Sequence, residues 1–205
     1  GDKHGFPVFP LNYKTEEGDV TGFKDSGFLP SAFINMLAFL GWNPGDEKEI
    51  FSLEELIDSF SLERVSKSGA KFDFEKTKWF NQQHIRLLNN KKIYEIIKQH
   101  FTEHKEEKVT KIIELEKERA LFLSDIVSNS KIYFKELKID YKDYVIKKSN
   151  QETKDILCDV LEKLININDF TKDKIEIVIK EYIDSKDLKF GDLLPLLRFV
   201  LTGEK

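Results

Sequence analysis

Cysteine is almost missing from this 205-residue chain, and Cys158, the one present, excludes an internal disulfide bond. We expect this thiol to pack inside its helix, as free cysteines commonly do. No apolar run approaches the roughly 18 residues that a membrane-spanning helix requires, and no secretory signal pattern is seen. These absences exclude a disulfide-stabilised or membrane-spanning protein and favour a cytoplasmic one.

Several signatures of catalytic and metal sites are also missing. The chain has no GxGxxG fingerprint, no P-loop and no Ser/His/Asp arrangement that rises above chance. His100 and His104, four residues apart on one predicted helix, could bind a metal, but no third ligand is evident. We therefore expect no metal site, no cofactor and no catalytic residue within the chain, which disfavours an independent enzyme.

Composition favours helices over sheet. Charged residues make up 34% of the chain, prolines number only five, and alternating β-branched runs are short. A chain of this length can build one large or two small cores. We predict an all-α fold.

Helix boundaries are clear in residues 30–73. Pro30 starts an amphipathic helix, and Gly41 is expected to end it in the left-handed conformation. Ser52 and Glu55 have the spacing of a capping box, which predicts a helix over roughly 52–60. Asp73 is the expected N-cap of a third helix.

Charge reverses sharply within the same region. From Asp46 to Glu63 the chain carries seven acidic residues and one base, whereas Arg64–Lys92 carries eight bases and two acidic residues. Lysines spaced among small residues can contact phosphates, and the candidates are Lys67, Lys71, Lys78 and Arg86. The alternative is an ordinary solvated surface.

Helical patterns continue to the end of the chain. A longer helix is predicted from Val109 to about Ile126, with Lys117 and Arg119 inside it. The last part predicts a small bundle, including a helix capped by Thr171 and a final helix over Asp192–Thr202 with Pro195 in its first turn. On residue pattern alone, Arg119 is as consistent with pairing to its helical neighbours as with binding a ligand.

Three blocks resemble one family. GFLPSAFINMLAFLGWNPG, EIFSLEELIDSFSLERVSKSGAKFD and KWFNQQHIR are similar to the region of bacterial glutamyl-tRNA synthetases that directly follows their KMSKS-type catalytic loop. The opening GDKHGFPVFPLNY resembles the version of that junction that carries an insertion. The family's HIGH-type and KMSKS-type motifs occur nowhere in the 205 residues. The resemblance therefore implies a C-terminal fragment of a class I aminoacyl-tRNA synthetase.

The resemblance also implies an organisation and partners. Residues 1–90 would form a helical stem-contact region, and residues 91–205 a helical-bundle anticodon-binding region that is truncated at its C-terminus, because family members usually continue past LTG. The partners would be tRNA(Glu) and an N-terminal catalytic domain in the same polypeptide, in a monomer. That domain would use ATP with magnesium to attach glutamate to tRNA, and the fragment alone would be inactive.

Two arginines are the main candidates for reading anticodon bases. The KER triplet that ends in Arg119 looks like the family's anticodon-pocket helix, and LLPLLRFVLTG, which contains Arg198, resembles its PLRxxLTG segment. Lys117 stands beside Arg119, and Lys67, Lys71, Lys78 and Arg86 would contact tRNA phosphates. The alternative function is a helical protein-interaction module without RNA binding. Such a module would bind its partner through an apolar face with little salt dependence, whereas tRNA binding should weaken steeply with salt.

Overall fold

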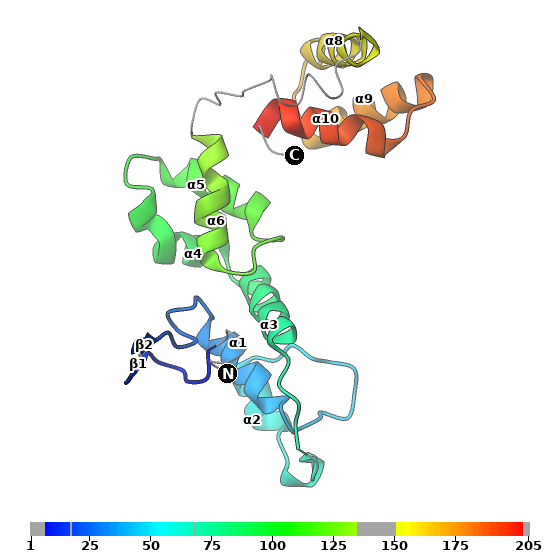
Figure 1. The fold of residues 1–205 in the computed structure, drawn as a ribbon. Coiled ribbons are helices and arrows are strands. Elements are labelled where there is room, and N and C mark those ends of the chain that lie inside the picture. The colour runs from blue at the N-terminus through cyan, green and yellow to red at the C-terminus, as the bar shows by residue number, and fades with distance from the viewer. Residues whose placement is uncertain (1–6, 17, 68, 135–150, 203–205) are drawn as a thin grey trace. The chain divides into compact units, whose positions relative to one another are not determined.

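The computed structural model describes residues 7–16, 18–67, 69–134 and 151–202. These residues divide into two units, one ending at Phe134 and the other beginning beyond it. The described part is predominantly helical, as predicted, and its sheet is limited to two paired three-residue strands, β1 (Tyr13–Thr15) and β2 (Gly18–Val20) (Figure 1).

The first unit contains six α-helices and three short 3₁₀ segments in its described residues. The α-helices are α1 (Pro30–Ala38), α2 (Leu53–Ser59), α3 (Phe74–Leu87), α4 (Asn90–Ile97), α5 (Glu106–Glu116) and α6 (Leu123–Asn129). The 3₁₀ segments are η2 (Leu62–Arg64), η3 (Lys98–His100) and η4 (Ser130–Tyr133). The second unit contains α8 (Gln151–Ile165), α9 (Lys172–Ser185) and α10 (Phe190–Thr202) (Figure 1).

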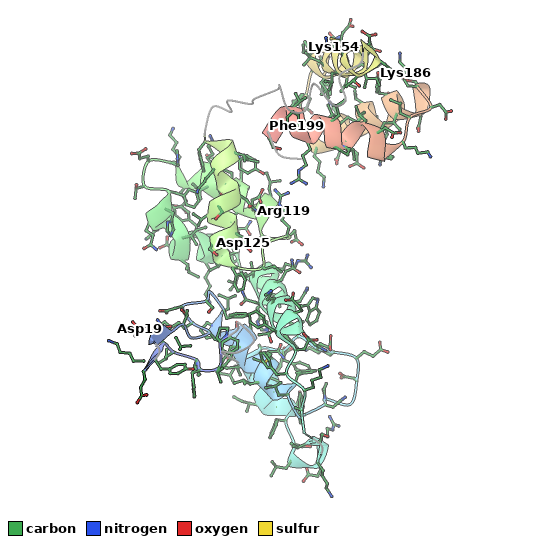
Figure 2. All side chains as sticks on the ribbon, in the orientation of Figure 1. Asp19, Arg119, Asp125, Lys154, Lys186 and Phe199 are labelled. Carbon is green, nitrogen blue, oxygen red and sulfur yellow. The ribbon has the colours of Figure 1, made fainter. Side chains whose placement is uncertain are left out.

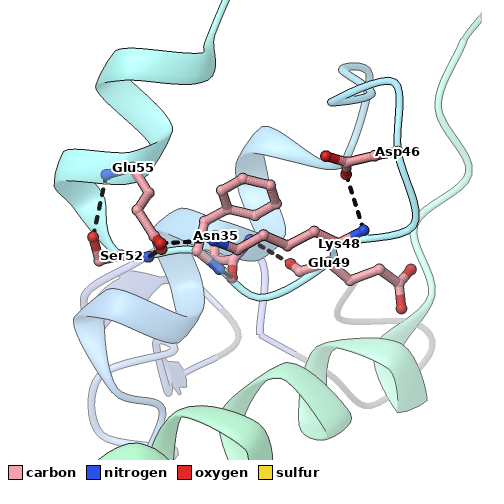
Figure 3. Close-up of polar contacts among 7 residues, drawn as sticks. Asn35, Asp46, Lys48, Glu49, Ser52 and Glu55 are labelled. Carbon is pink, nitrogen blue, oxygen red and sulfur yellow. Dashed lines mark hydrogen bonds and ion pairs between the residues drawn. The ribbon is translucent and has the colours of Figure 1, made fainter.

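Two of the predicted helix starts are confirmed by their caps. The Ser52 hydroxyl accepts a hydrogen bond from the Glu55 N–H at 3.2 Å, and the Glu55 carboxylate accepts one from the Ser52 N–H at 2.9 Å (Figure 3). The Asp73 carboxylate accepts the Lys76 N–H at 3.1 Å at the start of α3. Each cap satisfies backbone groups that the first helical turn leaves without partners.

Buried polar side chains join α1, α3 and the loops between them. Asn35 donates to the Glu49 carbonyl at 3.1 Å, and its Oδ1 accepts the Phe51 N–H at 2.9 Å (Figure 3). The same oxygen lies 3.0 Å from His84 Nε2. On α3, Asn81 accepts the Leu29 N–H at 2.8 Å and donates to the Leu121 carbonyl at 2.6 Å. Asn35 and Asn81 are both fully buried, so these bonds fix how the segments meet.

Apolar side chains from α3, α4, α5 and α6 and from the segments between them form the main core of the first unit. This core contains Ile85, Ile93, Ile97, Phe101, Val109, Ile113, Ala120 and Ile126. A smaller cluster of Trp42, Phe51 and Leu56 lies between the end of α1 and α2. In the second unit, Val160, Tyr182, Ile183 and Leu193 bring α8, α9 and α10 together. Burial of these apolar side chains is the main source of stability for the helices that carry them.

Three sequence expectations about helix bounds were wrong. Gly41 has no positive φ, because α1 already ends at Ala38 and Phe39 caps it in the right-handed conformation. The helix predicted from Val109 to Ile126 is broken between α5 and α6. The final helix begins at Phe190, so Pro195 lies in its interior and not in its first turn. Thr171 is the N-cap residue of α9, as predicted, although its side chain makes no cap hydrogen bond.

Cys158 and His100 also depart from expectation. Cys158 is exposed on α8 and does not pack inside its helix. His100 ends η3, and His104 lies in the following turn, where its ring stacks on Phe134 with centroids 3.8 Å apart. The two histidines therefore do not lie four residues apart on one helix.

Candidate nucleic-acid interface

The basic loop before α3 is anchored to the end of α1. The Ser66 N–H donates to the Gly41 carbonyl at 2.6 Å, and Val65 forms an isolated bridge with Trp42. The Arg64 guanidinium donates to the Pro44 carbonyl. These contacts fix the backbone at the start of the loop, directly before Lys67.

Lys67 and Lys71 are the exposed cations of this loop. Within the described part of the chain, neither forms an ion pair. Lys71 lines an open cavity of 260 Å³ between the loop and residues 39–43, and also a smaller one of 80 Å³. An ammonium group beside such a hollow suits a phosphate oxygen.

Lys78 differs from Lys67 and Lys71. Its ammonium lies 2.8 Å from the Glu75 carboxylate and 4.8 Å from the centre of the Phe74 ring. Only 25% of its side chain is exposed. These contacts satisfy the charge within α3, so Lys78 is less available to a polyanion than the two loop lysines.

The predicted helix is interrupted at the KER triplet, and the interruption is built by specific contacts. After α5, the Arg119 and Ala120 N–H groups both donate to the Glu116 carbonyl at 3.2 Å. The Asp125 carboxylate then accepts the N–H groups of Leu121 and Phe122, each at 2.9 Å, and starts α6. Figure 2 labels Asp125, at the start of α6, and Arg119, in the segment between α5 and α6. We call residues 117–121 the KER turn.

Arg119 is held by a buried carboxylate. Its Nε donates to Glu116 Oε2 at 2.9 Å, and its Nη2 donates to Glu116 Oε1. Glu116 is fully buried, whereas 59% of the Arg119 side chain is exposed. Arg119 therefore does pair with a near neighbour in the sequence, as the alternative interpretation proposed. That neighbour, Glu116, is buried in the core and does not lie on the helix surface.

Two further side chains complete the Glu116 site. Asn129 donates to Oε2 at 3.0 Å and the Tyr133 hydroxyl donates to Oε1 at 2.7 Å. Burial acts to raise the pKa of Glu116, but hydrogen bonds from Arg119, Tyr133 and Asn129 outweigh it, and the pKa lies below its ordinary value. Burial, together with the bond to Glu116, raises the pKa of Tyr133 to about 12. Glu116 is therefore charged and Tyr133 neutral at physiological pH.

Arg86 and Lys117 connect the KER turn to α3. Arg86 Nε donates to the Glu118 carbonyl at 2.9 Å and lies 3.4 Å from the Glu118 carboxylate. The Lys117 ammonium donates to the Leu88 carbonyl at 3.4 Å. Both residues were predicted to contact tRNA, and the structure gives them a direct part in shaping the turn that presents Arg119.

Arg198 lies in the second unit, on α10. It is exposed, and its carbonyl accepts the Thr202 hydroxyl at 2.8 Å. The neighbouring Leu196 and Phe199 face the interior of the unit. The helix therefore presents Arg198 on its outer side.

Sequence reasoning missed Glu116 and Asn129 as functional candidates, and it did not connect Tyr133 with Glu116. One signal was present: Glu116 follows Val109, Ile112 and Ile113 at core-facing spacing on α5. An acidic residue on an apolar face needs buried partners, and that requirement points to a polar site. Its partners could not be identified in advance because they come from α6 and η4.

Across residues 7–134 and 151–202, gaps excepted, no three His, Cys, Asp or Glu side chains cluster so as to hold a metal ion. None of the described helices is both long enough and apolar enough to cross a membrane.

Known proteins match the chain over its whole length. It is 41% identical to the glutamate–tRNA ligase of Flavobacterium johnsoniae and 37% identical to that of Bacteroides thetaiotaomicron. These alignments cover 99% and 100% of this chain, but only 41% and 42% of the relatives. The chain thus spans about two fifths of the length of the relatives it matches.

Solved structures agree with the sequence relatives. A glutamate–tRNA ligase from Elizabethkingia meningosepticum, in complex with its amino acid, superposes with a TM-score of 0.77 at 39% identity, covering 100% of this chain and 42% of that one. The enzyme from Elizabethkingia anophelis gives a TM-score of 0.72 at 38% identity, over 100% and 41% of the two chains. The predicted family resemblance and fold are therefore confirmed.

Family models match two segments of the chain. Residues 15–79 match the catalytic domain of class I tRNA synthetases of the E and Q type, and residues 92–205 match the anticodon binding domain. The KER turn and Arg198 both lie in the second segment. Because that segment is more than half of the chain, the protein belongs to the anticodon binding domain family, and it is homologous throughout to glutamate–tRNA ligases.

Proposed function

We propose that this chain is the tRNA-binding portion of a glutamate–tRNA ligase. The observation that carries the proposal is Arg119, whose half-exposed side chain is held in a turn within the segment that matches the anticodon binding domain. A planar guanidinium can bond two acceptors of a base edge at once or stack on an unpaired base. Arg198 would contribute a second anticodon contact from α10.

Lys67 and Lys71 would bind phosphates of the tRNA stem, with Lys78, Arg86 and Lys117 in supporting positions. In this assignment residues 1–90 form the stem-contact region and residues 91–205 the anticodon-binding region. The boundary between residues 90 and 91 separates two proposed roles but not two hydrophobic cores, because α3 and α4 pack in the same core. Phosphate contacts position the RNA without reading its sequence.

The reaction itself would take place on a catalytic domain of the same polypeptide, in a cytoplasmic monomer. That domain would form glutamyl-adenylate from glutamate and ATP with magnesium, and then transfer the glutamyl group to tRNA(Glu). Alone, the present chain would position tRNA without charging it. Positioning lowers the entropic cost of bringing the tRNA end to the adenylate.

A tRNA titration tests the proposal. Binding of tRNA(Glu) and of an anticodon-altered tRNA should be measured at about 50 mM and about 200 mM salt, for the wild type and Arg119→Ala. We expect the wild type to prefer tRNA(Glu), Arg119→Ala to lose much of that preference, and both to bind more weakly at high salt. Equal binding of the two tRNAs by the wild type would refute anticodon recognition.

The alternative, a protein-interaction module, is favoured by one observation. Apolar side chains at and after α2 are exposed, with Ile57 at 68% and Leu62 at 77%. Such a surface would bind a protein partner with little dependence on salt. Failure of the chain to bind any tRNA at low salt would favour this alternative. Pyrophosphate exchange catalysed by the chain alone would contradict both functions.

A further inference from the structure

The open cavity of 260 Å³ lies between the basic loop before α3 and residues 39–43, and we call it the hollow. Its volume equals that of roughly eight or nine water molecules, slightly below the roughly 300 to 1,000 Å³ of pockets that enclose drug-sized ligands. The charged side chains that line it are Arg64 and Lys71, and none of the described residues in its lining is acidic. Charge therefore favours a small anionic ligand.

The side of the hollow that follows α1 is apolar and well packed. Phe39, Leu40 and Trp42 line it. Trp42 is buried, and its ring packs edge-on against Phe39 and Phe51, with centroids 5.8 Å and 6.0 Å apart. Phe39 and Leu40 are only partly buried, so some of their apolar surface stays open to a ligand. Such a surface suits the flat face of a nucleobase, which a phosphate alone would not need.

Backbone contacts join the loop side of the hollow to this apolar surface. The Ser66 N–H donates to the Gly41 carbonyl at 2.6 Å, and Val65 forms a bridge with Trp42. From the loop, the exposed Lys71 contributes an ammonium group. The hollow is therefore formed without a ligand, with an apolar wall on one segment and a cation on the other.

Two glycines leave space in the lining of the hollow. A Cβ added to Gly41 or to Gly69 would meet no atom within 4 Å apart from its chain neighbours. Neither residue has a positive φ, so the backbone conformation does not require glycine at either position. A larger side chain at Gly41 can therefore occupy the hollow while the fold is kept.

We propose that the hollow binds one unpaired nucleotide of RNA outside the anticodon, with the base on Phe39 and Leu40 and the phosphate on Lys71. Lys67 does not line the hollow and would contact the RNA backbone alone. The inference rests on the proposed tRNA-binding function and deepens it, because it gives one of the two loop lysines a nucleotide site. A base held by its flat face is bound whatever the anticodon is.

Adenosine monophosphate (AMP) is the probe for the hollow itself, added to the isotope-labelled 205-residue chain and followed by NMR. We expect the backbone N–H signals of Gly41 and Gly69 and the indole N–H signal of Trp42 to shift. AMP should bind roughly 5-fold or more tightly than ribose 5-phosphate, since stacking of a base supplies roughly 5- to 150-fold. Equal affinity for the two compounds, or shifts that miss these three signals, overturns the inference.

Gly41→Gln fills the hollow, and Gly191→Gln is its matched control. A Cβ at Gly191, on α10, also meets open space, but Gly191 does not line the hollow. Gly41→Gln should weaken AMP binding by roughly 5-fold or more, and Gly191→Gln should leave it unchanged. Equal AMP affinities of the two variants would place the nucleotide elsewhere.

Two lysine variants keep the inference falsifiable if Gly41→Gln fails to fold. Lys71→Ala should weaken the binding of both AMP and ribose 5-phosphate, because both carry the phosphate. Lys67→Ala removes the same charge from the same loop and should weaken neither. Equal losses in the two variants would mean that the loop attracts anions without a site.

Binding of tRNA(Glu) and of an anticodon-altered tRNA connects the hollow to RNA. Gly41→Gln should weaken both by the same factor, although it removes no positive charge. Unchanged tRNA binding by this variant overturns the inference and leaves the proposed function intact. Failure of the wild type to bind any tRNA at low salt refutes the proposed function and, with it, RNA as the occupant of the hollow.

Discussion

Single buried polar residues determine how the segments of the first unit meet. Asn35 and Asn81 are both fully buried, and each satisfies backbone groups that would otherwise lack partners. His84 lies beside Asn35, where burial lowers its pKa below the ordinary value. An uncharged imidazole can donate from Nε2 to the Asn35 oxygen. At the scale of single residues, polar side chains are buried where their hydrogen-bonding groups find partners.

The neutral state of His84 predicts a pH dependence of stability. Its pKa is lower in the folded than in the unfolded protein, so the unfolded state binds more protons below pH 6.5. The contribution of His84 to the free energy of unfolding is therefore fully present above pH 6.5. It is lost as pH falls through the lowered pKa, by at most about 1.4 kcal/mol per pH unit. Urea unfolding of the wild type and His84→Gln between about pH 7.5 and about pH 5 measures the effect.

We expect the stability of His84→Gln to change less with pH over this range. Four glutamates also have lowered pKa values and make the protein less stable in acid: Glu54, Glu55, Glu116 and Glu176. Their effect falls below pH 4.5, outside the pH range of the experiment. Parallel pH profiles for the two proteins would show that His84 is not the titrating group.

At the scale of elements, local signals were readable from the sequence and tertiary ones were not. The Ser52–Glu55 box and the Asp73 cap involve residues three apart, so their chemistry is visible in the sequence. The break after Glu116 was missed because the KER triplet continues a helical pattern. The break depends on contacts from α3, α6 and η4, which local spacing does not record. Arg119 was found through family resemblance, and its buried partner only through the fold.

Arg86 provides a prediction for the KER turn. It binds the carbonyl and carboxylate of Glu118, so Arg86→Ala should loosen residues 117–121 while the α4–α5 core stays folded. Hydrogen–deuterium exchange should become faster in these residues and remain unchanged around Ile93 and Val109. Lys91→Ala, an exposed cation on α4, serves as the charge-matched control. Unchanged exchange in the turn would mean that α6 and Asp125 hold it without Arg86.

Asn81 provides a second prediction at this scale, for the packing of α3. Asn81→Ala should lower the free energy of unfolding by about 2 to 4 kcal/mol, because the Leu29 N–H and the Leu121 carbonyl both lose their partner. Urea unfolding measures the change. Gln83→Ala, at a half-buried position on the same helix, should change stability by about 0.5 kcal/mol or less. Similar losses in the two variants would contradict a special role for the Asn81 amide.

For the molecule as a whole, net charge is a poor guide to its partner. The chain carries a net charge of −4, yet acidic and basic residues are segregated along it. Many of the lysines of the two units are paired with carboxylates, as Lys98 is with Glu95 and Lys111 with Glu107. The field that a polyanion meets is set by the cations that remain exposed in one place, such as Lys67 and Lys71.

This distinction predicts different effects for equal changes of charge. Lys67→Ala/Lys71→Ala should weaken binding of tRNA(Glu) and of anticodon-altered tRNA by the same factor, and should lower the salt slope by about 1.4 to 1.8 for two lost phosphate contacts. Lys98→Ala/Lys111→Ala removes the same charge from ion-paired positions and should change the slope little. Equal slopes for the two double variants would show that tRNA responds to the net charge of the protein, and the basic loop would then lose its assignment. A weakening confined to tRNA(Glu) would instead make Lys67 and Lys71 readers of sequence, because contacts to phosphates alone cannot tell one anticodon from another.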